Sequence, residues 1–269
     1  MIDNGGFTID GIPALELKII MTKDSDRPIA PATVDRFLSI PGRNGLLDFG
    51  ADVGARYFNL DCRVITRNYL ELQEVIERIA SALLDGYGRP KTVKIVLDSR
   101  PDRYYLVRYS GSLSIDRLFG LGSFILPLVA VDPYARSLTS SDSVILDSDI
   151  LLDSDIRLDD DWSYQVAGNA VFEVNNWGTM IVKPTIVVSG KFSNLHITAN
   201  GKTFDYNVQI NNETLTINSE RLTVKKGGTN ALSGMSGNFI ELIAGINNIS
   251  ITGTSLIADV SFDFETRYF

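Results

Sequence analysis

The sequence predicts a mainly β protein of two domains, an α+β domain at residues 1–136 and a β-sandwich at residues 162–269. Two observations support this prediction. Tyr, Phe, Thr, Val and Ile, which favour strands, are plentiful, and Asn and Gly cluster between runs of them. A nearly continuous apolar run at residues 124–131 stops at Asp132-Pro133, beyond which the texture of the sequence changes. Because proline lacks an N–H, strand pairing is expected to end there, and we interpret the run as the last strand of the first domain. Periodicity alone does not distinguish this strand from a short buried helix.

The first domain is expected to hold a mainly antiparallel sheet with one helix on a face. The helix is predicted at residues 68–86, where apolar side chains recur with a 3.6-residue period. Asn68 would cap its first turn, Glu71 would reach back as in a capping box, and Gly86 would end it. Alternating and β-rich runs predict the strands at residues 7–11, 15–19, 57–64, 93–97, 104–109 and 111–115.

Two segments of the first domain fit neither a regular strand nor a helix. Residues 21–34 are polar and contain two prolines, so they should form an extended connection or arm. At residues 40–50 the turn signals Pro41-Gly42 and Asn44-Gly45 follow one another, with apolar residues on both sides. We expect a tight loop between strands there, with Arg43 exposed at its tip.

The charge of the chain is concentrated in one segment. The formal net charge is −8, which argues against a general nucleic-acid binder, because such proteins usually carry a basic face. Residues 142–161 hold eight aspartates and one arginine, which sum to −7. No apolar run is long enough to cross a bilayer, and residues 1–11 lack the features of a secretory signal. A protein made and assembled in the cytosol fits this composition.

Residues 137–161 are interpreted as an acidic linker, within which residues 144–161 repeat a six-residue unit. The regularly spaced carboxylates of the repeat belong to Asp147, Asp149, Asp153, Asp155, Asp159 and Asp161. They could form a weak calcium site, although the glycine and the terminal glutamate of an EF-hand loop are missing. The repeat could also form a strand ladder between subunits or an acidic docking surface for a basic partner. The fourth interpretation is a solvated, extended connector.

The second domain is predicted to be a β-sandwich, with jelly-roll topology as one possibility, because short β segments alternate with Asn/Gly turns and no helical period is present. Asn200-Gly201 is the clearest hairpin turn. The predicted strands are residues 171–174, 185–188, 195–198, 204–208, 215–217, 222–224, 249–251 and 257–264.

The sequence predicts no catalytic site and no cofactor. His196 and Cys62 are the only histidine and the only cysteine, so there is no zinc-ligand spacing and no thiol or hydroxyl with an evident histidine base. Cys62 lies inside a predicted strand and is expected to be a buried thiol. His196 is expected on the outward face of its strand. A sugar site on the sandwich is an alternative, for which Trp162 and Trp177 could supply an aromatic platform, whereas burial in the core is the commoner place for such residues.

With these features in place, the chain resembles the distal tail protein (Dit) family of siphoviruses, which are long-tailed bacteriophages. The resemblance covers most of the chain outside the aspartate repeat, and it rests on the order and spacing of several short motifs. These motifs are Phe7-x-Ile9-x-Gly11, Ile40-Pro41-Gly42-Arg43-x-Gly45-x-Leu47-Asp48-x-Gly50, Asp98-x-x-Pro101-Asp102-Arg103-Tyr104-Tyr105, Asp132-Pro133-Tyr134-Ala135 and Phe239-x-x-Leu242-x-x-Gly245-x-Asn247-x-Ile249.

The resemblance implies a structural virion protein at the tip of a phage tail, assembled in the bacterial host cytoplasm, and not an enzyme. Members of the family form a hexameric hub ring that joins the tail tube to the tail-associated baseplate hub protein. Their second domain is a galectin-like β-sandwich that projects outward and docks receptor-binding proteins in some members. Contact with the host cell surface would then be indirect, without membrane insertion. The alternative function is a carbohydrate-binding, lectin-like adhesion protein that acts through the sandwich.

The family also uses an extended arm and a β-hairpin for contacts between subunits. Two segments of this chain are the corresponding candidates, the polar connection at residues 21–34 and the loop at residues 41–50. The subunit-interface candidates are therefore Arg27, Pro28, Pro41, Gly42, Arg43, Asn44 and Gly45.

Overall fold

The computed structural model describes residues 6–118, 121–138 and 162–269. The chain divides into two compact units, Met1–Ala135 together with Phe269, and Arg136–Tyr268. The aspartate repeat, with all six candidate calcium ligands, lies outside the described residues, and its four interpretations stay predictions. In the described part of the chain, no helix combines the length and the apolar character that a membrane span requires.

The first unit is built on an antiparallel sheet with the strand order β2-β1-β7-β8-β10-β6-β3. Its strands are β1 (Phe7–Ile9), β2 (Ile12–Pro13), β3 (Ile19–Met21), β6 (Arg56–Ile65), β7 (Thr92–Leu97), β8 (Arg100–Tyr109) and β10 (Leu121–Ala130), and β9 (Asp116–Leu118) pairs with the start of β10. The apolar run at residues 124–131 is thus a strand between β8 and β6, and the helix alternative is excluded. Its pairing with β6 ends at Ala130, just before Asp132-Pro133.

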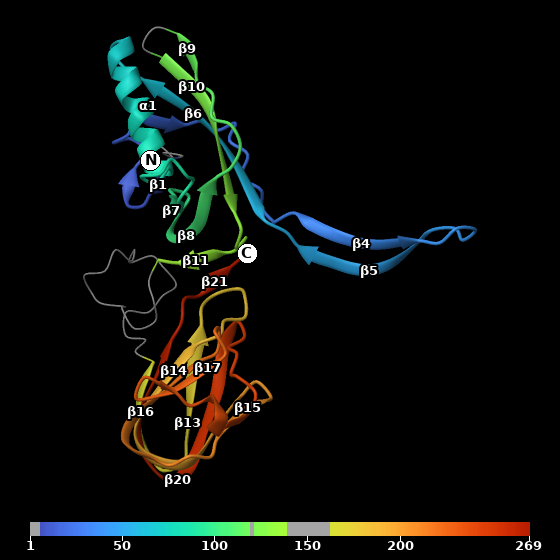
Figure 1. Cartoon of the computed structure of the whole chain (residues 1–269), viewed down its shortest axis with the longest axis vertical. Coiled ribbons are helices and arrows are strands. Elements are labelled where there is room, and N and C mark those ends of the chain that lie inside the picture. Colours follow the sequence, from blue (N-terminus) through green and yellow to red (C-terminus); the bar gives the residue numbers. More distant parts are fainter. Residues whose placement is uncertain (1–5, 119–120, 139–161) are drawn as a thin grey trace. The chain divides into compact units, whose positions relative to one another are not determined.

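Helix α1 (Tyr69–Leu83) covers one side of this sheet (Figure 1). Its buried side chains pack on alternate residues of the strands, which from β6 are Phe58, Leu60, Cys62 and Val64. The Asn68 side chain caps the helix by accepting a hydrogen bond from the Glu71 N–H at 2.9 Å. Glu71 reaches back as predicted, but its carboxylate accepts from the N–H of Arg67 at 2.8 Å, one residue before the cap. The helix ends at Leu83 and not at Gly86, because the extended residue Leu84 pairs with Pro90.

The strand predicted at residues 111–115 is wrong. Gly111 has a φ of +121°, a conformation outside the β region, and pairing with β10 begins only at β9. Leu113 and Ile115 nevertheless pack against the core of the first unit. The alternation of apolar residues in this segment therefore reflects packing against the core, and the segment itself is irregular and not paired as a strand.

The second unit is a mainly β sandwich without an α-helix among its described residues. The strands of its nine-stranded sheet are β12 (Ser163–Ala167), β13 (Ala170–Asn176), β14 (Thr185–Ala199), β15 (Lys202–Tyr206), β16 (Ile210–Asn218), β17 (Thr223–Lys226), β18 (Thr229–Asn230), β19 (Met235–Gly237) and β20 (Gly245–Asp263). The short strands β11 (Ala135–Ser137) and β21 (Arg267–Tyr268) pair with each other outside this sheet. A 3-10 turn, η1 (Leu232–Gly234), precedes β19. The mainly β fold class with one helix in the first unit is confirmed.

Two long strands hold the sandwich together where four short ones were predicted. Residues 185–188 and 195–198 are both part of β14, and residues 249–251 and 257–264 fall almost entirely within β20. The first half of β14 pairs with β16 and the second half of β20, while its second half pairs with β15 and the first half of β20. The register shifts at Gly190, Ser193 and His196, so both strands bend without ending. The turn-like residues between the predicted strands therefore mark bends.

Candidate assembly interface

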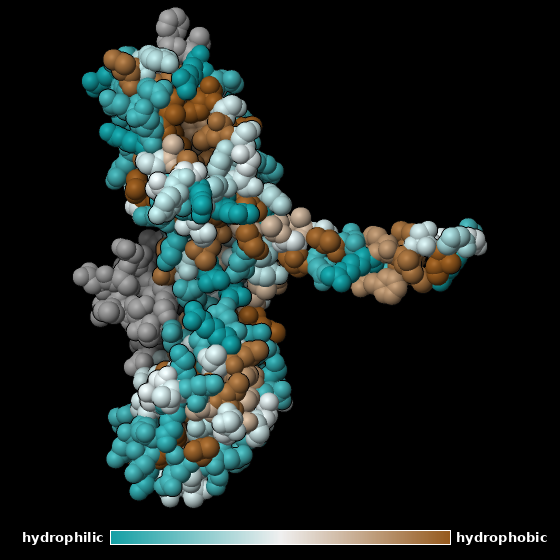
Figure 2. Space-filling model, in the orientation of Figure 1, coloured by the Kyte–Doolittle hydropathy of each residue, from teal (hydrophilic) through white to brown (hydrophobic). Residues whose placement is uncertain are grey.

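A β-hairpin, formed by β4 (Thr33–Ser39) and β5 (Leu46–Val53), projects from the first unit as a separate two-stranded sheet (Figure 1). We call residues 33–53 the arm. All its side chains are exposed except that of Leu47, which is half-buried. Phe37 and Phe49 expose 55% and 66% of their surface, and apolar and polar residues alternate along the arm (Figure 2). Exposed aromatic and aliphatic side chains on a two-stranded sheet indicate a surface that a partner covers, because such a hairpin has no core of its own.

The two faces of the arm carry different charge. Cross-strand partners share a face, so one face, here the acidic face, presents Asp35, Phe37, Leu46, Asp48 and Val53. The opposite face presents Val34, Leu38 and Phe49 beside an ion pair between Arg36 and Asp52. The charges cancel on this second face, whereas the acidic face holds two carboxylates and no cation.

Gly50 forms a bulge that shifts the register of the arm between Asp35 and Phe37. Its φ of +88° is one that glycine adopts without strain, and its N–H donates to the Asp48 carboxylate at 2.8 Å.

Arg56 anchors the base of the arm and was not identified from the sequence. Its side chain is 3% exposed, and its guanidinium donates to the carbonyl oxygens of Pro28 at 3.1 Å, Pro133 at 3.2 Å and Ile29. It also donates to the Tyr105 hydroxyl at 3.0 Å. One side chain thus joins the segment before the arm to the segment after β10. The alternation of β6 could have revealed it, because Arg56 lies two residues before Phe58 and so on the same, buried face of the strand.

The structure separates the interface candidates into two groups. Pro41, Gly42, Arg43, Asn44 and Gly45 are all exposed and form the loop between β4 and β5, where the N–H of Arg43 donates to the carbonyl of Ile40 at 3.1 Å. The tight loop is therefore present, with Arg43 at the tip of the arm.

Arg27 and Pro28 lie instead at the base of the arm, the first exposed and the second half-buried. The seven residues of β4 separate the two groups by roughly 23 Å at the usual rise of a strand. Their role in subunit contacts stays a prediction.

A second exposed surface lies on the first unit, on the side of the sheet opposite α1. Buried and exposed residues alternate along β6 and β10, and the residues that do not face the core lie on this side of the sheet. We call this surface the open face. Its exposed apolar residues are Ile20, Tyr57, Ile65, Leu121 and Ile125. Arg63 is exposed among them, as the register partner of both Ile20 and Ser123. A cavity of about 500 Å³ opens beside Ile125, with Asp61, Asp116 and three serines in its wall.

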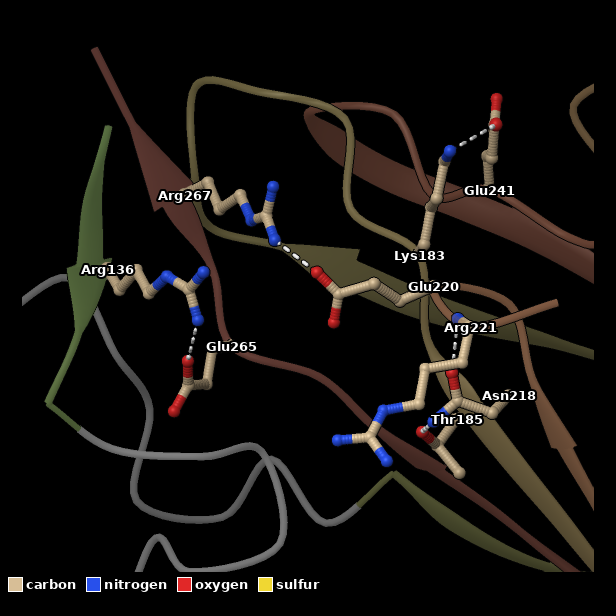
Figure 3. Close-up of polar contacts among 9 residues, drawn as sticks. All are labelled: Arg136, Lys183, Thr185, Asn218, Glu220, Arg221, Glu241, Glu265 and Arg267. Carbon is tan, nitrogen blue, oxygen red and sulfur yellow. Dashed lines mark hydrogen bonds and ion pairs between the residues drawn. The ribbon is translucent and has the colours of Figure 1, made fainter. Parts of the chain in front are cut away.

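The second unit contains a charged cavity of about 350 Å³. In Figure 3, Arg136 points toward Glu265 and Arg267 toward Glu220, with N···O distances of 3.4 and 2.5 Å. Lys183, which also lines the cavity, lies 3.8 Å from Glu241. The cavity is therefore lined by cations that already have carboxylate partners, which is the arrangement of a structural ion-pair cluster.

The residues considered for other chemistry lie in separate places. Trp162 is buried in the core of the second unit and Trp177 is half-buried, so Trp162 is not an exposed platform for a sugar. His196 is exposed as predicted, with Nδ1 2.5 Å from the Asp205 carboxylate. Cys62 is fully buried, and burial raises the pKa of its thiol to about 12, so it is protonated at neutral pH. Within the described ranges no three His, Cys, Asp or Glu side chains are grouped as metal ligands would be.

Comparisons with known proteins identify a related domain and a related fold. Residues 15–130 match the family of the phage tail protein RIFT-related domain. Over the whole chain the fold matches the crystal structure of the Dit protein of phage SPP1, described as a paradigm of the hub adsorption apparatus in phages that infect Gram-positive hosts. The TM-score is 0.70 at 15% identity, covering 98% of this chain and 99% of that one.

The resemblance to siphophage distal tail proteins is thereby confirmed: residues 15–130 match a phage tail protein domain, and the whole chain shares the fold of SPP1 Dit.

Two baseplate structures of phage p2 match more distantly. The activated baseplate with strontium gives a TM-score of 0.42 at 10% identity, covering 97% of both chains. The activated baseplate with calcium gives 0.40 at 10% identity, covering 96% of this chain and 97% of that one. No curated protein sequence matches the chain.

Proposed function

We propose that this chain forms a hexameric hub ring at the tip of the phage tail, made by its first unit. The ring would join the tail tube to the baseplate hub protein, and the sandwiches would face outward and dock receptor-binding proteins. No catalytic role is part of this proposal. The phage tail domain at residues 15–130 and the fold shared with SPP1 Dit support it.

The observation that carries the proposal is the arm. A closed ring needs two different surfaces on each copy, one for each neighbour, related by a rotation. The arm offers apolar side chains that its own chain leaves in water, and burying them stabilises a complex by about 25 cal/mol per Å² of apolar surface. An arm of this kind favours a head-to-tail contact with a neighbouring copy over a symmetric dimer.

Removal of the arm tests the proposal. The N–H of Gly54 donates to the carbonyl of Ala32 at 2.7 Å, so the ends of the arm are already adjacent and residues 33–53 can be replaced by an Asn-Gly turn. We expect the full chain to show the mass of a hexamer in native mass spectrometry and the shortened chain to be a monomer that still unfolds cooperatively in a circular dichroism melt. An Arg78→Glu variant, altered on the exposed side of α1, serves as the control. A full chain that is a monomer at all concentrations would overturn the proposal.

The carbohydrate-binding alternative has weaker support in the described residues. Trp162 is buried, and the cations that line the cavity of the second unit already pair with carboxylates. A glycan array probed with the full chain separates the two functions. Binding to a defined glycan by a chain that stays monomeric would favour the lectin-like adhesion protein.

A further inference from the structure

We propose that the open face of the first unit receives the arm of a second copy of this chain. In this contact the acidic face of the arm lies over Arg63, and Arg43 at the tip enters the cavity lined by Asp61 and Asp116. The inference rests on the proposed ring and names the surface on which each arm docks. That surface is formed by β3, β6, β9 and β10.

Both surfaces are apolar and exposed within their own chain. On the acidic face of the arm, Phe37 and Leu46 are each more than half exposed. On the open face the same holds for Tyr57, Ile65 and Ile125. Each surface is a pleated sheet that leaves one side uncovered, and two such sheets pack face to face at about 10 Å. Because arm and open face are both exposed on one copy, the contact joins different copies.

The charges select the face of the arm that docks. Among the described residues, no ion pair involves the side chains of Arg63 and Arg43, of Asp35 and Asp48 on the arm, or of Asp61 and Asp116. The acidic face would therefore bring unpaired carboxylates to Arg63, while the opposite face brings only the closed pair of Arg36 and Asp52. Complementary charges at a contact between surfaces speed association and fix its register.

The spacing of these charges agrees on the two surfaces. Asp116, Ser123 and Arg63 lie in one row across β9, β10 and β6, so Asp116 and Arg63 are two strand spacings apart, roughly 10 Å. On the arm, Asp48 lies three residues after Gly45, the end of the loop that carries Arg43, and three residues of strand span roughly 10 Å as well. An arm that crosses the strands of the open face would therefore bring Arg43 to Asp116 and Asp48 to Arg63.

A reciprocal charge exchange tests the contact. We expect Arg43→Asp and Asp116→Arg each to raise the concentration needed for half-assembly at least tenfold, measured by sedimentation velocity. The double variant should recover most of the lost association, because the pair is restored with opposite polarity. Arg63→Glu should weaken assembly similarly without rescue by Asp116→Arg. Arg78→Glu is the control, and circular dichroism melts confirm that each variant is folded.

The possible outcomes separate this inference from the proposed function. If the wild-type chain assembles and loses assembly without its arm, but Arg63→Glu and Asp116→Arg assemble normally, the ring stands and the docking surface is wrong. If the double exchange fails to recover association, the pairing of Arg43 with Asp116 is wrong. If the wild-type chain never associates, the proposed function itself fails.

Discussion

Arg56 is a buried cation whose described partners are backbone carbonyls and one phenol, without a carboxylate. The carbonyls of Pro28, Ile29 and Pro133 would lose a charged donor in an Arg56→Met variant, and unsatisfied buried groups of this kind are costly. We expect the first unit to lose about 3 kcal/mol of unfolding free energy. Arg56→Lys should recover only part of this unfolding free energy, because an ammonium group cannot donate to all of these carbonyls in the planar geometry of a guanidinium.

The measurement for Arg56 uses signals that the two units do not share. Among the described residues the only α-helix is α1, so ellipticity at 222 nm in a urea titration reports on the first unit. Both tryptophans of the chain, Trp162 and Trp177, belong to the second unit, and their emission should unfold as in the wild type. Equal loss of stability in both signals would contradict the local role of Arg56.

Cys62 should make the stability of the first unit fall as the pH rises above 9. Burial raises the pKa of the Cys62 thiol from 9.0 to about 12, and the negative charge of Asp61 is a second, smaller cause. Between these pH values the native state keeps a proton that the unfolded chain loses, so the first unit should lose stability as pH rises from 9 to 12. A Cys62→Ala variant should show a shallower pH slope over that window. In the wild type at pH 8, a thiol reagent such as DTNB should react only as the first unit unfolds; rapid labelling of the folded protein would contradict the burial.

At the scale of elements, the sequence predicted those parts of the fold whose pattern is local. Helix α1 and the alternating strand β6 each satisfy one period over many residues, and their burial follows it. Strand β10 was recognised instead as a nearly continuous apolar run that ends at Asp132-Pro133. The arm was predicted only as a loop and a connection, because its alternation buries nothing within its own chain. The open face could not be predicted, since it depends on which strands lie next to one another, and this is decided by the sheet order and not by spacing in sequence.

The bend shared by β14 and β20 depends on Gly190. Its φ is +154°, and a Cβ built there would lie 2.2 Å from the carbonyl oxygen of Ile257. Gly190→Ala should therefore force the two strands apart and destabilise the second unit by more than about 3 kcal/mol. The control is Gly201→Ala at a hairpin turn, with φ +75° and nothing within 4 Å, which should cost about 1 kcal/mol. Tryptophan emission in urea measures both, and equal effects would show that the close approach at Gly190 relaxes freely.

At the scale of the whole molecule, the arm and the open face are different surfaces on one unit, so a contact between them is heterologous. In such a contact each copy would use its arm on one neighbour and its open face on the other, and the assembly would grow until rotation closes it. A copy that has lost one surface can still use the other. This property distinguishes arm-to-face docking from an interface in which arm packs on arm, because in the second case a copy without its arm could bind no partner at all.

Mixing two defective copies is therefore the most direct experiment on the assembly. A chain with residues 33–53 replaced by a turn keeps only the open face, and an Arg63→Glu chain keeps only the arm as a functional surface. Each alone should stay a monomer at a concentration just above the one at which half of the wild-type chain assembles. Their mixture should form a dimer of one copy of each and nothing larger, because the surfaces left over in the pair are the two defective ones. Native mass spectrometry separates the species by the mass of the missing arm. Larger complexes, or no complex at all from the mixture, would contradict docking of the arm on the open face.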